Sequence, residues 1–110
     1  MREKDLKSIK IIKLEIDRIQ EVLQGLDHAR QNSKKVQEYR DLLTSKEDDL
    51  LKKKIEIETF VASIEDAEIR LILTLKFIDL KSWNYISKRL HYDRSTVYKK
   101  FKTFIKNTSK

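Results

Sequence analysis

Residues 82–106 read SWNYISKRLHYDRSTVYKKFKTFIK, and this stretch decides how the C-terminal part of the chain folds. Ser82 and Asp93 are residue types whose side chains accept hydrogen bonds from the free amides of a helix's first turn. Their spacing predicts an eight-residue helix after Ser82, a three-residue turn, and a second helix that begins at Arg94. Two short helices joined by so tight a turn are typical of a helix-turn-helix.

The apolar residues of this stretch fall on one side of each expected helix. Ile86 and Leu90 share a face of the first helix, because residues four apart are neighbours on a helix surface. The second helix gathers its apolar residues in the same way, at Val97, Phe101, Phe104 and Ile105. Trp83 and Tyr85 stand at the entry of the first helix, where we expect them to pack in the core rather than stack on bases.

The positive charge of the chain is concentrated at its C-terminal end. The whole chain has 25 Lys and Arg against 18 Asp and Glu, a formal charge of +7. Residues 81–110 hold 9 of these basic residues and a single acidic residue, Asp93, whereas residues 1–80 are nearly balanced at 16 against 17. A clustered charge of this kind attracts polyanions. Nucleic acid is favoured over anionic lipid, because no apolar anchoring face accompanies the charge.

The second helix is expected to turn a basic face away from its apolar side. In a helix-turn-helix the N-terminal part of the second helix enters the major groove of DNA, where side chains meet base edges. The residues expected at base edges are Arg94, Ser95, Tyr98 and Lys99. The residues expected at phosphates, which supply affinity without sequence preference, are Lys88, Lys102 and Lys106. The predicted set of DNA-binding residues also includes Thr96.

The segment LKSWNYISKRLHYDRSTVYKKFKTFIK, with the apolar helix IRLILTLKFID before it, resembles region 4 of the sigma-70 family. It is more closely similar to the C-terminal domains of small ArpU/RinA-like transcription regulators from phages of Gram-positive bacteria. The likeness spans residues 63–106 and rests on Ser82-Trp83, Ile86, Leu90, Tyr92-Asp93 and Val97-Tyr98. It implies a phage or prophage protein that binds a promoter or operator, with RNA polymerase as a further partner.

Two positions depart from the family pattern. His91 stands at the turn position that usually holds glycine, and the second helix lacks an acidic residue at its opening. A residue other than glycine at this turn costs about 1 kcal/mol if its backbone must be left-handed, which a folded protein tolerates. The fold therefore carries over from the family, whereas the preference for particular bases does not.

The N-terminal half of the chain carries two amphipathic segments. In the first, apolar residues recur at spacings of 3 and 4, typical of a helix-packing seam, at Ile9, Ile12, Ile16, Ile19, Leu23 and Leu26. Gly25 is placed to end this helix, and the polar stretch 27–35 reads as a loop. In the second, apolar residues recur every seven positions, at Val36, Leu43, Leu50, Ile57 and Ile64. The two seams predict an antiparallel hairpin, or a coiled coil that pairs with a second copy.

Capping patterns set the expected helix starts in this region. Thr44 and Ser45, with Asp48 after them, form a capping pattern that favours a start of the second helix near residue 46, and a start near residue 35 stays open. Ser63 followed by Asp66 repeats the pattern and predicts a third helix over residues 64–79.

The residue inventory argues against an enzyme. One glycine cannot build a phosphate-binding loop, and the chain has no cysteine. His28 and His91 have no second ligand at metal-binding spacing, so we expect no metal and no cofactor. The opening MREKDLKSIK lacks the apolar region of a signal peptide and no apolar run could span a bilayer. We therefore expect a cytoplasmic, nucleoid-associated protein with no membrane partner.

The sequence thus predicts an all-α protein with a helical hairpin or coiled coil over 1–62 and a DNA-binding helix-turn-helix over 63–110. The expected function is sequence-specific binding of double-stranded DNA in transcriptional regulation. A homodimer through the N-terminal helices is expected, because paired modules bind two-fold operators more tightly than single ones. The alternative is a helical adaptor that binds RNA polymerase or another phage factor without specific DNA recognition.

Overall fold

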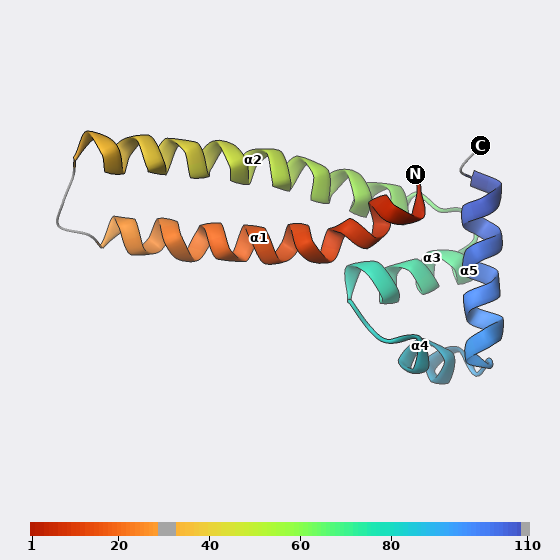
Figure 1. Cartoon of the computed structure of the whole chain (residues 1–110). Helices are drawn as coiled ribbons and strands as arrows, with labels where there is room; N and C mark the ends of the chain where they lie inside the picture. The colour runs from red at the N-terminus through yellow and green to blue at the C-terminus, as the bar shows by residue number, and fades with distance from the viewer. Residues whose placement is uncertain (29–32, 109–110) are drawn as a thin grey trace. The chain divides into compact units, whose positions relative to one another are not determined.

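The computed structural model describes residues 1–28 and 33–108, and these residues form helices joined by short connections, with no strand among them (Figure 1). The elements in order are α1 (Glu3–Asp27), α2 (Lys34–Ala62), α3 (Ala67–Leu73), the π-helical turn η1 (Thr74–Ile78), α4 (Trp83–Leu90) and α5 (Arg94–Thr108). The predicted all-α fold is confirmed. None of the helices in the described part of the chain combines the length and the apolar character needed to cross a membrane.

The chain folds as two compact units. The hairpin unit consists of residues 11–55. The terminal unit consists of residues 1–10 together with residues 56–110, so it contains both ends of the chain. The functional division at residue 62 predicted from the sequence stays a prediction.

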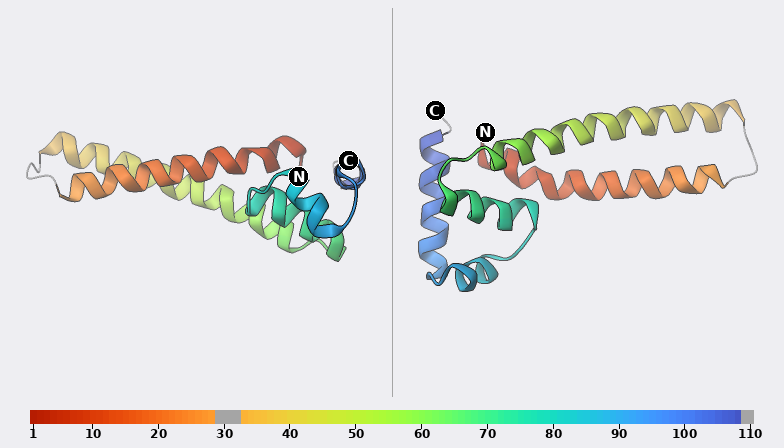
Figure 2. Two further views of the ribbon diagram at one scale, coloured as in Figure 1. Left: turned by 90° about the horizontal axis from the view of Figure 1, so that it is seen from below. Right: turned by 180° about the vertical axis from the view of Figure 1, so that it is seen from behind.

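In the hairpin unit, residues 11–27 of α1 and 34–55 of α2 run side by side in opposite directions (Figures 1 and 2). The buried side chains of this unit are Ile12, Ile16 and Ile19 from α1 and Leu50 from α2. Near the connection between the helices, the Arg40 guanidinium lies 2.9 Å from the Asp27 carboxylate and donates to the carbonyl of Leu26. The two N-terminal helices therefore form an antiparallel hairpin, which is one of the two predicted arrangements.

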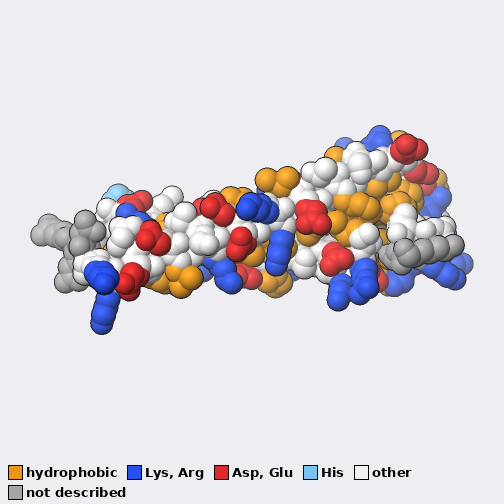
Figure 3. Space-filling model, turned by 90° about the horizontal axis from the view of Figure 1, so that it is seen from above, with side chains coloured by type: hydrophobic (Ala, Val, Ile, Leu, Met, Phe, Trp, Pro, Cys, Tyr) orange, Lys and Arg blue, Asp and Glu red, His pale blue; other side chains and the backbone are white. Residues whose placement is uncertain are grey.

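The surface of the hairpin unit mixes charges of both signs with exposed hydrophobic side chains (Figure 3). Ile11 and Leu14 on α1, and Leu42 and Ile55 on α2, are each more than half exposed. The apolar seams of the two helices are thus buried against each other, while these four side chains lie outside the seams.

The prediction that Gly25 ends the first helix is wrong. α1 continues through Gly25 to Asp27, and the His28 amide still donates to the Gln24 carbonyl at 3.3 Å. A helical glycine costs about 1 kcal/mol relative to alanine, and the packing of the seam residues on both sides of Gly25 outweighs that cost.

Of the two starts left open for the second helix, the one favoured near residue 46 is wrong and the one near residue 35 agrees with the structure. α2 begins at Lys34, where the Ser33 side chain accepts a hydrogen bond from the Val36 amide at 3.2 Å. Thr44 lies within the continuous helix, because the seam that repeats every seven residues packs along its whole length. Of the predicted loop 27–35, Asp27, Lys34 and Lys35 are helical, and residues 29–32 lie outside the described part.

The third helix is shorter than the predicted range of 64–79. It begins at Ala67, because Asp66 is its N-cap and accepts a hydrogen bond from the Ile69 amide at 3.0 Å. The Ser63 hydroxyl instead donates to the Phe60 carbonyl at the end of α2. Beyond Leu73 the helix widens into η1 and closes with a bond from the Asp79 amide to the Thr74 carbonyl at 2.9 Å.

The terminal unit has a compact apolar core that includes the first turns of α1. The largest fully buried side chains of the described chain all belong to it, namely Phe101, Leu6, Ile9, Ile72, Leu73, Ile86, Val61 and Val97. Phe101 lies at its centre, with ring centroids 5.5 Å from Phe77 and 5.4 Å from Trp83. The N-terminal turns of α1 are therefore part of the same core as α4 and α5.

Replacing Gly25 with alanine should raise the free energy of unfolding by about 0.5 to 1 kcal/mol, because alanine loses less backbone freedom in a helix. An added Cβ would meet nothing within 4 Å, so no clash opposes the gain. Denaturant titration followed by circular dichroism measures the change. A destabilised Gly25→Ala variant would contradict the helical conformation at this residue.

Leu6→Ala should destabilise the protein by about 2 to 5 kcal/mol, because it empties a buried site in the terminal unit. Leu14→Ala is the matched control, since the same atoms are removed from a residue that is 55% exposed, and its cost should stay within about 0.5 kcal/mol. Equal costs for the two substitutions would show that the first turns of α1 do not belong to the core.

Candidate nucleic-acid interface

The helix-turn-helix begins at the predicted cap. The Ser82 side chain accepts a hydrogen bond from the Tyr85 amide at 3.1 Å, and α4 then runs for eight residues to Leu90. α5 begins at Arg94, and the Val97 amide donates to the backbone carbonyl of Asp93 at 3.1 Å. Figures 1 and 2 show that α4 runs crosswise to α5 at the N-terminal end of α5.

The turn between α4 and α5 depends on a left-handed residue. His91 has φ 59° and ψ 37°, as expected for the position that usually holds glycine. This conformation lets the amide of Tyr92 donate to the Ser87 carbonyl at 3.1 Å, which closes the end of α4. Histidine is one of the residues that adopts this conformation more often than most, so the strain is modest.

Glu68 of α3 ties the turn to α5. The Tyr92 hydroxyl donates to its carboxylate at 2.9 Å, and the Lys100 ammonium lies 2.9 Å from the other carboxylate oxygen. The Lys100 ammonium also lies 5.1 Å from the centre of the Tyr92 ring. The hydrogen bonds from Lys100 and Tyr92 hold the pKa of Glu68 below its usual value and raise the pKa of Lys100 and of Tyr92. This cluster fixes α5 and the turn against α3.

The packing of α5 leaves its predicted DNA-binding residues on the surface. Val97 and Phe101 are fully buried on the inner side of the helix. The exposed predicted residues of α5 are Arg94, Ser95, Tyr98, Lys99, Lys102 and Lys106, and Lys88 is exposed on α4. Thr96 is half-buried. The structure therefore brings six of the predicted residues onto the outer surface of one helix.

The aromatic residues at the entry of α4 differ in their packing. Trp83 is half-buried against Phe101, and its ring centroid lies 5.4 Å from that of Tyr98 with the two rings nearly perpendicular, so it packs as predicted. The prediction that Tyr85 belongs to the core is wrong, because its side chain is 42% exposed beneath Lys81. It precedes the buried Ile86, and one step along a helix turns a side chain by about 100°.

Lys102 has an acidic partner from the other end of the chain. Its ammonium lies 2.9 Å from a carboxylate oxygen of Glu3, whose second oxygen lies 3.5 Å from the ammonium of Lys7. The hydrogen bond from Lys102 is the main cause of a lowered pKa at Glu3, although partial burial opposes it. This pairing is not predictable from the sequence, because nothing local signals a contact between residues 99 positions apart.

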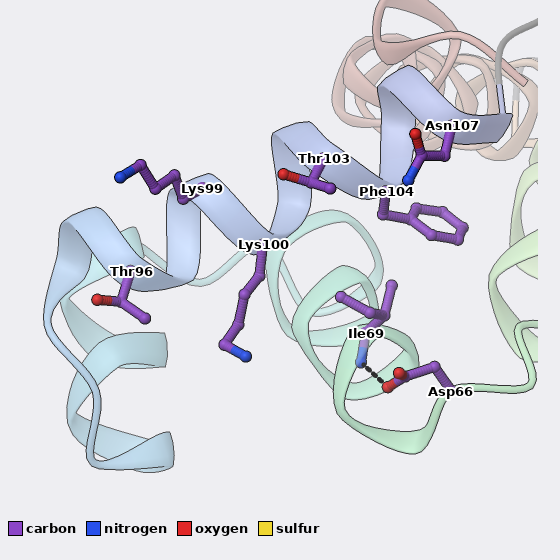
Figure 4. A pocket seen from close by; sticks show the side chains of 8 residues that line it. All are labelled: Asp66, Ile69, Thr96, Lys99, Lys100, Thr103, Phe104 and Asn107. Atoms are coloured by element: carbon purple, nitrogen blue, oxygen red, sulfur yellow. Dashed lines mark hydrogen bonds between the residues drawn. The ribbon is translucent and has the colours of Figure 1, made fainter.

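A groove of about 500 Å³ lies between α3 and α5 (Figure 4). Its lining residues are Asp66, Ile69, Thr96, Lys99, Lys100, Thr103, Phe104 and Asn107. Figure 4 shows Ile69 and Phe104 projecting between the two helices, whereas Lys99 points away from α3. The side chain of Lys99 is thus available on the outer surface. Across residues 1–28 and 33–108, no three His, Cys, Asp or Glu side chains lie close enough together to hold a metal ion.

Glu68→Gln should reduce stability near neutral pH and have a much smaller effect in acid. The folded-state pKa of Glu68 is lowered from 4.5, so its stabilising contribution is present above that value and is lost as the pH falls through the lower folded-state pKa. Denaturant midpoints of the wild type and variant at about pH 7 and about pH 3 measure the difference. A deficit that is equal at both pH values would contradict the charged contact.

The comparisons with known proteins give one match. No curated protein and no solved structure matches the chain. A family model described as a protein of unknown function, DUF1492, matches residues 27–108, which include all of α2, α3, α4 and α5. Because the match covers well over half of the chain, the protein belongs to the DUF1492 family.

Proposed function

We propose that the protein binds double-stranded DNA sequence-specifically and regulates transcription, with α5 as the recognition helix. The main support for this proposal is that α5 exposes a basic surface on one side, while Val97 and Phe101 on its opposite side are fully buried. An α-helix with its side chains is about 10 to 12 Å across, and the major groove of B-DNA is about 12 Å wide. The resemblance of residues 63–106 to sigma region 4 supports the same assignment.

The charge of α5 suits a polyanionic partner. The helix, RSTVYKKFKTFIKNT, contains five basic residues and no acidic residue. Lys100 is held by Glu68 and Lys102 by Glu3, whereas Lys99 points away from the neighbouring α3. In the proposed complex, Lys99 and Arg94 meet base edges while Lys88 and Lys106 meet phosphates.

Buried side chains and an ion pair hold α5 in place beneath its exposed surface. Val97 and Phe101 anchor one side of the helix in the core, and Lys100 is bonded to Glu68 of α3. A recognition surface that is fixed before binding loses less conformational entropy when it meets its partner. Specific readout in the major groove depends on such fixed geometry, because each hydrogen bond must meet a particular base edge.

Replacing both Lys99 and Lys106 with Glu should weaken binding to duplex DNA by more than about tenfold, because it reverses two charges on the proposed contact surface. The matched control replaces Lys52 and Lys53 of α2 with Glu, which changes the net charge equally on exposed residues of the hairpin unit. Titration of labelled duplexes, selected by the wild type from a random-sequence pool, gives the dissociation constants.

The wild type should bind its selected duplexes more tightly than a scrambled sequence, and the control should bind as the wild type does. If the wild type enriches no sequence and binds no duplex even at low salt, DNA binding is ruled out. That result would favour the helical adaptor, which needs no nucleic acid. Equal loss in the control and in the Lys99/Lys106 variant would show that net charge, rather than α5, carries the binding.

A further inference from the structure

A second group of basic side chains lies in the terminal unit, outside the helix-turn-helix. Lys7 and Lys10 are exposed on the first turns of α1, three residues apart and so on neighbouring positions of one helix surface. The same turns bury Leu6 and Ile9 completely. Their backbone is therefore held by the core of the terminal unit, and the two lysines are attached to a fixed support.

Contacts link Lys7 to the recognition helix through Glu3. The Glu3 carboxylate lies 3.5 Å from the Lys7 ammonium and 2.9 Å from the Lys102 ammonium. Lys102 in turn lies 5.8 Å from the centre of the Tyr98 ring on the exposed surface of α5. Lys7 is thus placed at the edge of α5 that carries Tyr98 and Lys102.

Lys76, which belongs to η1, lies near the same edge of α5. Its ammonium stands 4.9 Å from the centre of the Trp83 ring. Trp83 packs against Tyr98 at 5.4 Å. Turns of π-helix are rare and occur often at functional sites, and this one presents a lysine beside the recognition helix.

The charges around Lys76 repel it. Burial is the main cause of its lowered pKa, and the charges of Arg94, Lys10 and Lys7 lower that pKa further. Arg94 comes from α5 and the two lysines from α1, and each of them is close enough to Lys76 to act on its charge. Like charges gathered in this way are unfavourable in the free protein, and an anion placed among them relieves the repulsion.

We infer that Lys7, Lys10 and Lys76 form a phosphate-binding patch that contacts the DNA backbone beside the groove occupied by α5. This inference rests on the proposed function, because the patch lies along the edge of the proposed recognition helix. The N-terminal turns of α1 then act in DNA binding as well as in packing. The patch adds affinity without sequence preference, since phosphates are the same at every base pair.

The test measures how the affinity for duplex DNA depends on salt. Each phosphate neutralised by a cation contributes about 0.9 to the slope of the logarithm of the binding constant against the logarithm of the salt concentration. Replacing Lys7, Lys10 and Lys76 with Gln should therefore make the slope shallower by about 2 to 3, with the base preference unchanged. Replacing the same three residues with Arg keeps the charges and should preserve the slope.

The matched control replaces Lys46, Lys52 and Lys53 with Gln, which removes three exposed charges from the hairpin unit and should leave the slope as in the wild type. If the wild type binds duplex DNA and the Lys7/Lys10/Lys76 variant keeps its slope, the patch is ruled out and the proposed function stands. If the wild type binds no duplex at all, the proposed function itself fails. Should the loss of Lys76 disturb folding, the Lys7/Lys10 variant keeps the Trp83 contact and should still lower the slope by nearly 2.

Discussion

The burial of Phe101 sets the rotation of α5, and the candidate interface depends on that rotation. Its ring lies between Phe77 of η1 and Trp83 of α4, and it is completely buried. A side chain of this size can be buried in one orientation of the helix only, so the residues on the opposite side must face outward. Those residues include Lys99 and Lys106, which are exposed. The apolar core thus determines which charges a partner can reach.

Two carboxylates bind two of the five basic residues of α5. Glu68 bonds Lys100 and holds α5 against α3, whereas Glu3 bonds Lys102 from the first turn of α1. Lys99 directly precedes Lys100 in the sequence but points away from α3. Basic residues that look equivalent in the sequence therefore differ in their contacts. The number of basic residues in α5 alone overstates the positive charge that is available to a partner.

Local chemistry explains which features were predictable from the sequence. The cap at Ser82 and the turn at His91 depend on residues within a few positions of each other, and both were predicted, whereas the left-handed backbone of His91 was expected only if the turn required it. The helix end predicted at Gly25 is wrong, because the low helix propensity of glycine, about 1 kcal/mol relative to alanine, is outweighed by the packing of neighbouring seam residues. The pairing of Glu3 with Lys102 joins residues 99 positions apart and exists only once the chain has folded. Such contacts between distant residues place the first turns of α1 beside α5, which the seam pattern alone did not predict.

The central claim is that α5 enters the major groove, and site-directed cleavage of DNA tests it most directly. The chain has no cysteine, so Ser95→Cys provides one attachment point for a cleavage reagent at the start of α5. If α5 enters the major groove, a reagent attached at residue 95 should cut the DNA at only a few nucleotides within the bound site. The same reagent on a matched Lys52→Cys protein should give no cleavage above background. Equal and scattered cleavage from both positions, with DNA binding intact, would contradict the assignment of α5 as the recognition helix.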